Sequence, residues 1–178
     1  MMRNGKRDLR AMVPWLILAC VVVAADQITK GRVMDVVGHE GFIAVTSYFS
    51  LVLAFNRGAA FSFLNDAGVW SVYLFGAIAV VASGLMVWVL AHYGTQRRLA
   101  AALGFILGGA IGNLIDRVRF GHVIDFLDFH WSWLNTWSWM NRIFPGGHFP
   151  AFNVADSAIC AGVGLLLLDE FLRMRGAR

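Results

Sequence analysis

The sequence predicts an all-α membrane protein with four transmembrane helices, a small extracytoplasmic β-sheet and an interfacial aromatic-rich loop. Three observations support this prediction. Hydrophobic residues make up 58% of the 178 positions and charged residues only 15%, whereas about a quarter of the residues in soluble domains are charged. Four apolar stretches reach or approach the ~20 residues that a bilayer span needs. Lys and Arg gather in short segments next to these stretches.

The four apolar stretches are expected to form helices within a single polytopic membrane domain, residues 1–178. The second stretch is uncharged and carries Trp and Tyr near both ends, which is typical of aromatic belts at the two membrane surfaces. In the third, Gly104, Gly108 and Gly112 recur every fourth residue, so that another helix can approach closely along one face. The predicted helices span about residues 12–28, 69–93, 99–115 and 152–172.

The distribution of basic residues predicts the orientation in the membrane. Nine of the fifteen Lys and Arg lie at the N-terminus, in the turn at residues 97 and 98, and at the C-terminus. By the positive-inside rule, both termini and this turn are cytoplasmic. The longer loops, about residues 31–68 and 116–151, then face outward. No basic run of the kind that binds nucleic acid is present in the sequence, so we expect no nucleic-acid partner.

The two outer loops carry their own structural signals. Apolar side chains alternate along residues 49–56, which predicts a strand in a small sheet at the outer interface. In the second loop, Trp131, Trp133, Trp137 and Trp139 lie close together in the sequence, which favours a segment in the headgroup region.

Ionisable and amide side chains occur where the helices should reach the outer leaflet. Such groups are costly at membrane depth and usually have a function. Asp26 and Lys30 are four residues apart on one helix face and are expected to pair. Two aspartates in one partly dry site would share a proton, so that one can accept a proton while the other donates. The remaining groups are Asn113, Asp116, Arg117, Asp125, Asn153 and Asp156.

Several charged residues favour a structural interpretation. We expect Asp66, Asp128 and Asp169 to be solvated or salt-bridged. For Asp116, an ion pair or a helix-end role is as well supported as a catalytic one. The histidines show no metal-ligand spacing, so no metal site is predicted.

Five short blocks, in this order, resemble the bacterial lipoprotein signal peptidase (signal peptidase II) family. Each block alone is weakly specific, whereas five in order on four spans are highly specific. The resemblance covers nearly the whole chain. The blocks are Asp26-Gln27-Ile28-Thr29-Lys30, Asn56-Arg57-Gly58-Ala59-Ala60-Phe61-Ser62, residues 108–117 from Gly108 to Arg117, Val123-Ile124-Asp125-Phe126, and Phe152-Asn153-Val154-Ala155-Asp156-Ser157.

The resemblance implies an aspartic endopeptidase of the bacterial cytoplasmic (inner) membrane, with its active site near the outer leaflet. It would remove signal peptides from prolipoproteins by cutting before a lipidated cysteine. Asp125 and Asp156 would be catalytic. No cofactor or metal is implied, and we expect a monomer surrounded by membrane phospholipids. The substrate-binding or supporting residues would be Asp26, Lys30, Asn56, Gly108, Asn113, Arg117, Asn153 and Ala155.

Two other functions fit the same polar residues. One is a proton- or cation-coupled transporter subunit, because buried Asp, Asn and Arg also build ion paths. The other is a noncatalytic lipid-binding assembly subunit. The clustering of polar groups at one end of the helices, rather than along a route through the midplane, argues against transport.

Overall fold

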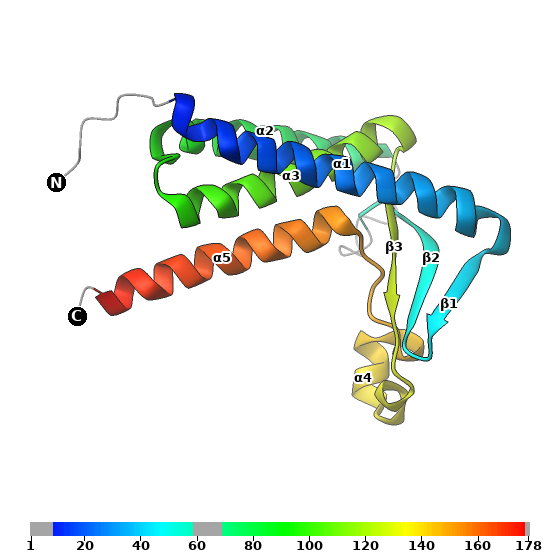
Figure 1. Cartoon of the computed structure of the whole chain (residues 1–178). Coiled ribbons are helices and arrows are strands. Elements are labelled where there is room, and N and C mark those ends of the chain that lie inside the picture. The colour runs from blue at the N-terminus through cyan, green and yellow to red at the C-terminus, as the bar shows by residue number, and fades with distance from the viewer. Residues whose placement is uncertain (1–8, 59–68, 177–178) are drawn as a thin grey trace.

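The computed structural model describes residues 9–58 and 69–176, and Figure 1 shows a bundle of long helices with a small sheet lying crosswise at one end. The long helices are α1 (Leu9–Glu40), α2 (Val69–Tyr93), α3 (Arg97–Phe120) and α5 (Val154–Gly176). Many large apolar side chains on α1, α2 and α5 point outward and are exposed, as expected of helices that face lipid.

Among residues 9–58 and 69–176, three helices are long and apolar enough to cross a membrane: Leu9–Gly38, Val72–Tyr93 and Arg97–Phe120. The α5 helix is not among them and carries Asp156, Asp169 and Glu170 near its ends. The bounds of α2 agree with the predicted 69–93. A multi-pass helical protein with a small sheet is therefore confirmed, and the fourth span stays a prediction.

The predicted end of the first helix near residue 28 is wrong, because α1 continues to Glu40. The hydropathy of the sequence falls after Ile28, but the helix is held beyond this point by packing. Val33 and Val37, one turn apart, are buried against Phe126 of the sheet. The predicted outer loop, residues 31–68, therefore begins with about ten residues of helix.

The third helix also runs past its predicted end at residue 115, to Phe120. It stops at Gly121, which has φ 72°, and the Gly121 N–H donates to the Arg117 carbonyl. This left-handed conformation favours glycine and terminates helices. Asn113, Asp116 and Arg117 thus lie inside the last turns of α3, and the predicted outer loop 116–151 starts later.

The α3 helix lies at the centre and contacts α1, α2 and α5. Its glycines allow close approach. A Cβ at Gly104 would lie 3.0 Å from the Trp15 carbonyl oxygen, and one at Gly108 would lie 2.6 Å from Val22 Cβ. Both contacts are with α1, and the packing role that the glycine spacing predicts is confirmed for this face.

The sheet has three antiparallel strands in the order β1 (Phe42–Thr46), β2 (Phe49–Asn56) and β3 (Val123–Phe129). The β2 strand coincides with the predicted strand at residues 49–56. The register shifts between Leu51 and Ala54, where β2 has one more residue than the part of β3 opposite it. The irregularity therefore belongs to β2, and the side chains of β3 alternate regularly. The free edge of β3 pairs with the chain just before α5, where Leu127 and Phe152 form a bridge.

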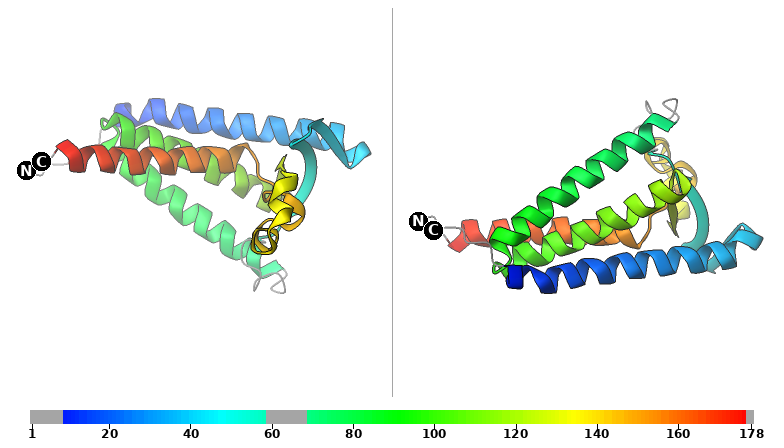
Figure 2. Two further views of the ribbon diagram at one scale, coloured as in Figure 1. Left: turned by 90° about the horizontal axis from the view of Figure 1, so that it is seen from below. Right: turned by 90° about the horizontal axis from the view of Figure 1, so that it is seen from above.

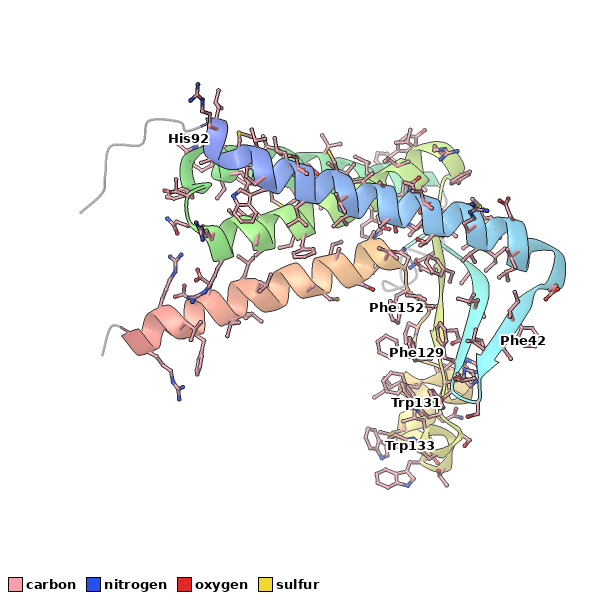
Figure 3. The ribbon with its side chains drawn as sticks, in the orientation of Figure 1. Phe42, His92, Phe129, Trp131, Trp133 and Phe152 are labelled. Carbon is pink, nitrogen blue, oxygen red and sulfur yellow. The ribbon has the colours of Figure 1, made fainter. Side chains whose placement is uncertain are left out.

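The chain between β3 and α5 forms an arm that extends away from the helices along the line of the sheet (Figure 1). It contains two short 3₁₀ turns and helix α4 (Ser138–Ile143). Figure 3 labels Trp131 and Trp133 in this arm, and the four tryptophans at 131, 133, 137 and 139 are all exposed. We call residues 131–147 the aromatic arm.

Candidate active site

Asp125 lies on β3, the central element of the site, and is 2% exposed. Each of its carboxylate oxygens accepts a hydrogen bond from an amide side chain. Asn153 Nδ2 donates to Oδ1 over 2.7 Å, and Asn56 Nδ2 donates to Oδ2 over 3.0 Å. Asn56 ends β2 and is itself oriented by the Gly58 N–H, which donates to its Oδ1. The carboxylate on β3 is therefore held by one side chain from the end of β2 and one from the start of α5.

Asp156 lies in the first turn of α5, where Asn153 precedes the helix as its N-cap. The Asp156 N–H donates to Asn153 Oδ1 over 2.9 Å, and the Asn153 N–H donates to Asp156 Oδ2 over 3.3 Å. This reciprocal pair is a capping box with Asn and Asp in the two positions. The start of α5 fixes the Asp156 side chain, and the helix N-terminus favours its negative charge.

Two asparagines connect the aspartates. Asn113 Nδ2 donates to Asp156 Oδ1 over 2.8 Å, and Asn153 Nδ2 donates both to Asp125 and to Asn113 Oδ1. The strand, α3 and α5 thus meet in one hydrogen-bonded network. The structure brings together the residues that the sequence placed at one depth.

A buried lysine supports this network from α1. Lys30 is 1% exposed, and its Nζ lies 2.8 Å from Asp26 Oδ2 and 2.7 Å from Asp116 Oδ2. It also donates to Asn113 Oδ1 over 3.2 Å. The predicted pairing of Asp26 with Lys30 is confirmed, and Asp116 takes the ion-pair role. Two carboxylates around one ammonium compensate for its burial.

The same carboxylates position the backbone of the two segments that carry Asp125 and Asp156. Asp26 Oδ1 accepts the Ala155 N–H over 2.9 Å, next to Asp156. Asp116 Oδ2 accepts the Ile124 N–H over 3.1 Å, next to Asp125. The ion pair on α1 and α3 is thereby tied to both aspartate-bearing segments.

Burial is the main cause of a raised pKa at Asp125, to about 6, and the nearby Asp156 charge adds to it. The hydrogen bonds from Asn56 and Asn153 oppose this shift because they stabilise the ionised form. A carboxyl group with such a pKa can hold or release a proton close to neutral pH, which is what acid–base catalysis requires.

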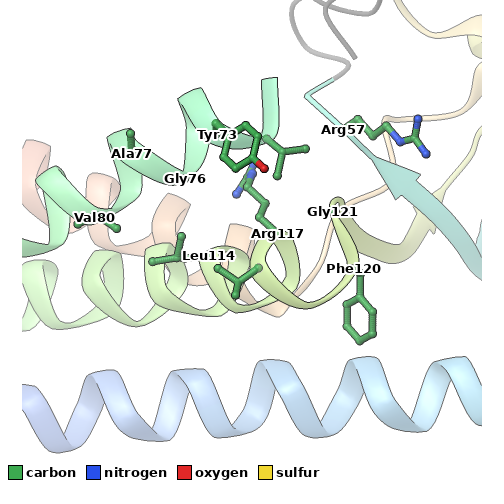
Figure 4. A pocket seen from close by; sticks show the side chains of 11 residues that line it. Arg57, Tyr73, Gly76, Ala77, Val80, Leu114, Arg117, Phe120 and Gly121 are labelled. Carbon is green, nitrogen blue, oxygen red and sulfur yellow. The ribbon is translucent and has the colours of Figure 1, made fainter. Parts of the chain in front are cut away.

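A cavity of about 650 Å³ lies between α2 and α3 beside the network. Figure 2 shows α2 diverging from the other helices toward the sheet, and Figure 4 shows Arg117 and Arg57 at the sheet end of the cavity. Arg117 donates to the Asn113 carbonyl and lies 5.4 Å from the centre of the Phe75 ring. The remaining wall is mostly apolar: Val72, Tyr73, Gly76, Ala77, Val80, Leu114, Val118, Phe120 and Gly121.

Not every residue singled out from the sequence belongs to this network. Gly108 lies against α1 rather than at the aspartates, and Asp169 pairs with Arg98 and Arg173 at the opposite end of the bundle. Asp128 lies within hydrogen-bonding distance of His148, with 2.9 Å between Asp128 Oδ2 and His148 Nδ1. Asp66 and positions 59–62 of the second block lie outside the described residues.

Sequence reasoning did not assign a role to Gln27, although it quoted this residue in the first block. Its Nε2 donates to Asp116 Oδ1 over 2.9 Å and to Asp26 Oδ2 over 3.1 Å, so Gln27 joins the two carboxylates that hold Lys30. Its position beside Asp26 within an apolar stretch was the available signal.

Comparison with known proteins decides the family. Residues 18–172 match the family described as signal peptidase (SPase) II. The chain belongs to the signal peptidase II family. A lipoprotein signal peptidase of Paraburkholderia phytofirmans is 49% identical over 168 residues, which is 94% of this chain and 90% of the relative. One from Burkholderia cenocepacia strain HI2424 is 46% identical, over 94% of this chain and 93% of the relative.

Two solved structures share the fold of this signal peptidase II. Both are described as bacterial membrane enzymes. One, at 2.3 Å resolution, is 24% identical with a TM-score of 0.73, covering 99% of this chain and 97% of its own. The other, at 1.9 Å, is 25% identical with a TM-score of 0.71, covering 94% and 97%. The protein is thus a multi-pass inner-membrane aspartic signal peptidase, and the transporter and scaffold alternatives are set aside.

Proposed function

We propose that Asp125 and Asp156 are the catalytic pair of this peptidase. The observation that carries the proposal is the hydrogen-bonded chain from Asp125 through Asn153 and Asn113 to Asp156, which holds two carboxyl groups in one buried network. Two carboxylates in such a place cannot both ionise cheaply, so they retain one proton between them.

Because the two aspartates hold one proton between them, the pair can supply both the base and the acid for peptide hydrolysis. The ionised carboxylate takes a proton from water as the water oxygen attacks the scissile carbonyl carbon. The protonated carboxyl group donates its proton to the carbonyl oxygen. When the C–N bond breaks, the carboxyl group that took the proton from water donates it to the leaving amine. The other carboxylate takes a proton from a hydroxyl of the tetrahedral intermediate as the new carbonyl forms, so the pair returns to its starting charge. Asn56, Asn113 and Asn153 keep the two groups oriented, while Asp26 and Asp116, paired with Lys30, accept backbone N–H groups of the segments that carry them.

We propose that the substrate is a prolipoprotein cut before a lipidated cysteine, as the name lipoprotein signal peptidase given to the relatives implies. The cavity between α2 and α3 supports this proposal, because its wall is mostly apolar and includes Arg117, which donates to the carbonyl of Asn113 in the aspartate network. Apolar substrate segments would lie along this wall. Arg117 and Arg57 at its sheet end would bind carbonyl or carboxylate oxygens of the substrate.

We propose four spans with both termini in the cytoplasm. The α5 helix has 23 residues, which at 1.5 Å each gives about 34 Å, enough for the ~30 Å hydrocarbon layer. Its acids lie toward its ends. The α2–α3 turn, the start of α1 and the end of α5 lie at one end of the bundle, opposite the sheet (Figure 1). The sheet and the aspartates would then lie at the outer leaflet, and the chain would act as a monomer among phospholipids.

The proposed catalytic pair is tested by cleavage of a lipidated prolipoprotein with purified protein. Asp125→Asn and Asp156→Asn should each lower the rate by at least about 10²–10⁴-fold, the contribution of one acid–base group. The control is Asp35→Asn, an exposed position on α1 with the same chemical change. If either variant cleaves like the control while keeping its melting temperature, the assignment is wrong.

The topology is tested by single cysteines after replacement of Cys20 and Cys160 by Ala. Ser47→Cys between β1 and β2 and Ser132→Cys in the aromatic arm should react with an impermeant maleimide in intact cells. Thr95→Cys in the α2–α3 turn should react only after permeabilisation. The opposite pattern would place the active site on the cytoplasmic side.

A further inference from the structure

A cluster of Asp128, His130 and His148 lies at the end of β3, where the aromatic arm leaves the sheet and returns to it. One ligand atom from each residue lies within 4.8 Å of the others. We refer to these three residues as the His–Asp cluster. They are separate from the aspartate network and take no part in the proposed reaction.

The backbone holds the two histidines opposite each other. His130 and His148 form an antiparallel bridge, the Trp131 N–H donates to the Gly147 carbonyl, and the Phe149 N–H donates to the Phe129 carbonyl. The imidazole rings stack with centroids 4.9 Å apart. The positions of both side chains are therefore set by the sheet and not by the loop between them.

The cluster lies on the opposite side of β3 from Asp125. Side chains alternate along a regular strand, so Asp128 and His130 share one side while Asp125, Phe129 and Trp131 share the other. In Figure 3, Phe129 and Trp131 lie on the side toward which the helix bundle extends. The His–Asp cluster therefore lies on the side of β3 that also carries Phe126, beyond the contact of Phe126 with the end of α1, and His148 is exposed.

The distances suit a small metal ion. His148 Nδ1 lies 2.9 Å from both Asp128 oxygens, and His130 Nδ1 lies 3.5 Å from Asp128 Oδ2. Ligands of a tetrahedral zinc ion with bonds of about 2.0 Å are about 3.3 Å apart. His130 Nδ1 is buried and, within the part of the chain that the structure describes, has no hydrogen-bond partner. His130 Nδ1, next to the Asp128 carboxylate, is therefore available to bind a metal ion.

We propose that the His–Asp cluster binds Zn²⁺ and thereby joins the two ends of the aromatic arm. Two imidazole nitrogens and one carboxylate oxygen are ligand types that zinc prefers, and three protein ligands leave a fourth position for water. The ion would give His130 Nδ1 a bonding partner and would join the two histidines and Asp128 through three metal–ligand bonds. Its role is structural, because it lies on the side of β3 opposite Asp125.

The experiment uses the full chain, purified in detergent with an affinity tag that contains no histidine. The protein is treated with EDTA, exchanged into buffer at neutral pH, and titrated with ZnCl₂. Bound zinc is measured by mass spectrometry after desalting. Tryptophan emission and the melting temperature are followed in parallel, since Trp131 adjoins His130.

Wild-type protein should retain one zinc ion per chain and melt at a higher temperature when zinc is added. His148→Gln and His130→Gln should weaken zinc binding by more than about 100-fold, since loss of even an outer-shell partner costs 10–100-fold. Because His148 is exposed, its variant should fold normally. His122→Gln is the matched control, because His122 packs against Phe55 outside the cluster.

Wild-type protein that keeps no zinc after desalting and melts unchanged would overturn the proposal. Equal zinc binding by wild type and His148→Gln would overturn it as well, since the ion would then sit elsewhere. These outcomes are independent of cleavage, so the catalytic assignment stands or fails separately.

Discussion

Asn153 and Asp156 exchange hydrogen bonds across the first turn of α5, each backbone N–H donating to the other side chain. The Asn153 amide also donates to Asp125. One asparagine therefore begins the helix that carries one aspartate and orients the other. The capping interaction and the active-site geometry depend on the same side chain.

Asn153 variants should separate these two roles. Asn153→Ala removes the cap, at a cost of about 0.5–2 kcal/mol in stability, together with the donor to Asp125. Asn153→Ser keeps a good N-cap acceptor but has no amide to reach Asp125. We expect Ser to recover most of the lost melting temperature while cleavage stays as low as in the Ala variant. Recovery of both properties by Ser would show that Asn153 acts only through the helix cap.

The raised pKa of Asp125 predicts a pH dependence of stability. Its pKa is about 6 in the folded protein, whereas an unfolded Asp titrates near 3.9. Between these values the folded state binds more protons, so its free energy of unfolding rises as the pH falls from about 6 to about 4. Below that range both states are protonated and this contribution is constant.

Thermal melts of wild type and Asp125→Asn across this range test the effect. Wild type should gain stability relative to the Asn variant as the pH is lowered, because Asn cannot titrate. Parallel curves for the two proteins would contradict a raised pKa at Asp125. The quantity to compare is the difference in stability between wild type and Asp125→Asn at each pH, because other carboxyl groups contribute equally to both proteins.

Hydropathy and residue spacing predicted the apolar helices, the β2 strand and most residues of the aspartate network, whereas Asn56 was indicated only by the family resemblance. The bounds of α2 agree because its ends coincide with the ends of an uncharged run. The last turns of α1 could not be predicted in this way, since Val33 and Val37 are held by the sheet. The β3 strand is buried on both faces at Val123–Phe126, so its sequence shows no alternation.

Contacts between distant residues were the other part that the sequence did not predict. Asp116 is adjacent to Arg117 in sequence, yet its partner is Lys30 on another helix. The two histidines of the His–Asp cluster are separated by the whole aromatic arm, and no ligand spacing in the sequence reveals them. Such pairs depend on strand pairing and helix packing rather than on local pattern.

Lys30 should be essential for stability. Lys30→Met leaves Asp26 and Asp116 buried without their cation, and breaking such a pair typically costs about 3–5 kcal/mol. Arg32→Met, at an exposed position on the same helix, is the control. Adding Asp26→Asn to Lys30→Met should restore part of the melting temperature by removing one uncompensated charge. Equal melting of Lys30→Met and the control would mean that the ion pair contributes little.

Gly108 should act through helix packing. A Cβ there would lie 2.6 Å from Val22 Cβ and 2.8 Å from the Ala19 carbonyl oxygen. Gly108→Ala should therefore separate α3 from α1 and lower stability by about 1–3 kcal/mol. Gly84→Ala, where nothing lies within 4 Å, should not. A loss of cleavage by Gly108→Ala at unchanged melting temperature would instead indicate direct contact with substrate.

The aromatic arm should lie in the headgroup region of the outer leaflet. Its tryptophans are exposed on a segment that extends crosswise from one end of the helix bundle (Figure 3), which would be unfavourable in water and is typical of interfacial segments. Replacing Trp15, Trp70 and Trp88 by Phe leaves emission from the arm alone. In vesicles this emission should be quenched strongly by lipids brominated near the headgroup and weakly by lipids brominated near the chain end. The reverse variant, with Phe at 131, 133, 137 and 139, reports on the helices and is the control. Quenching of the arm by aqueous iodide alone would show that it lies in water, away from the membrane surface.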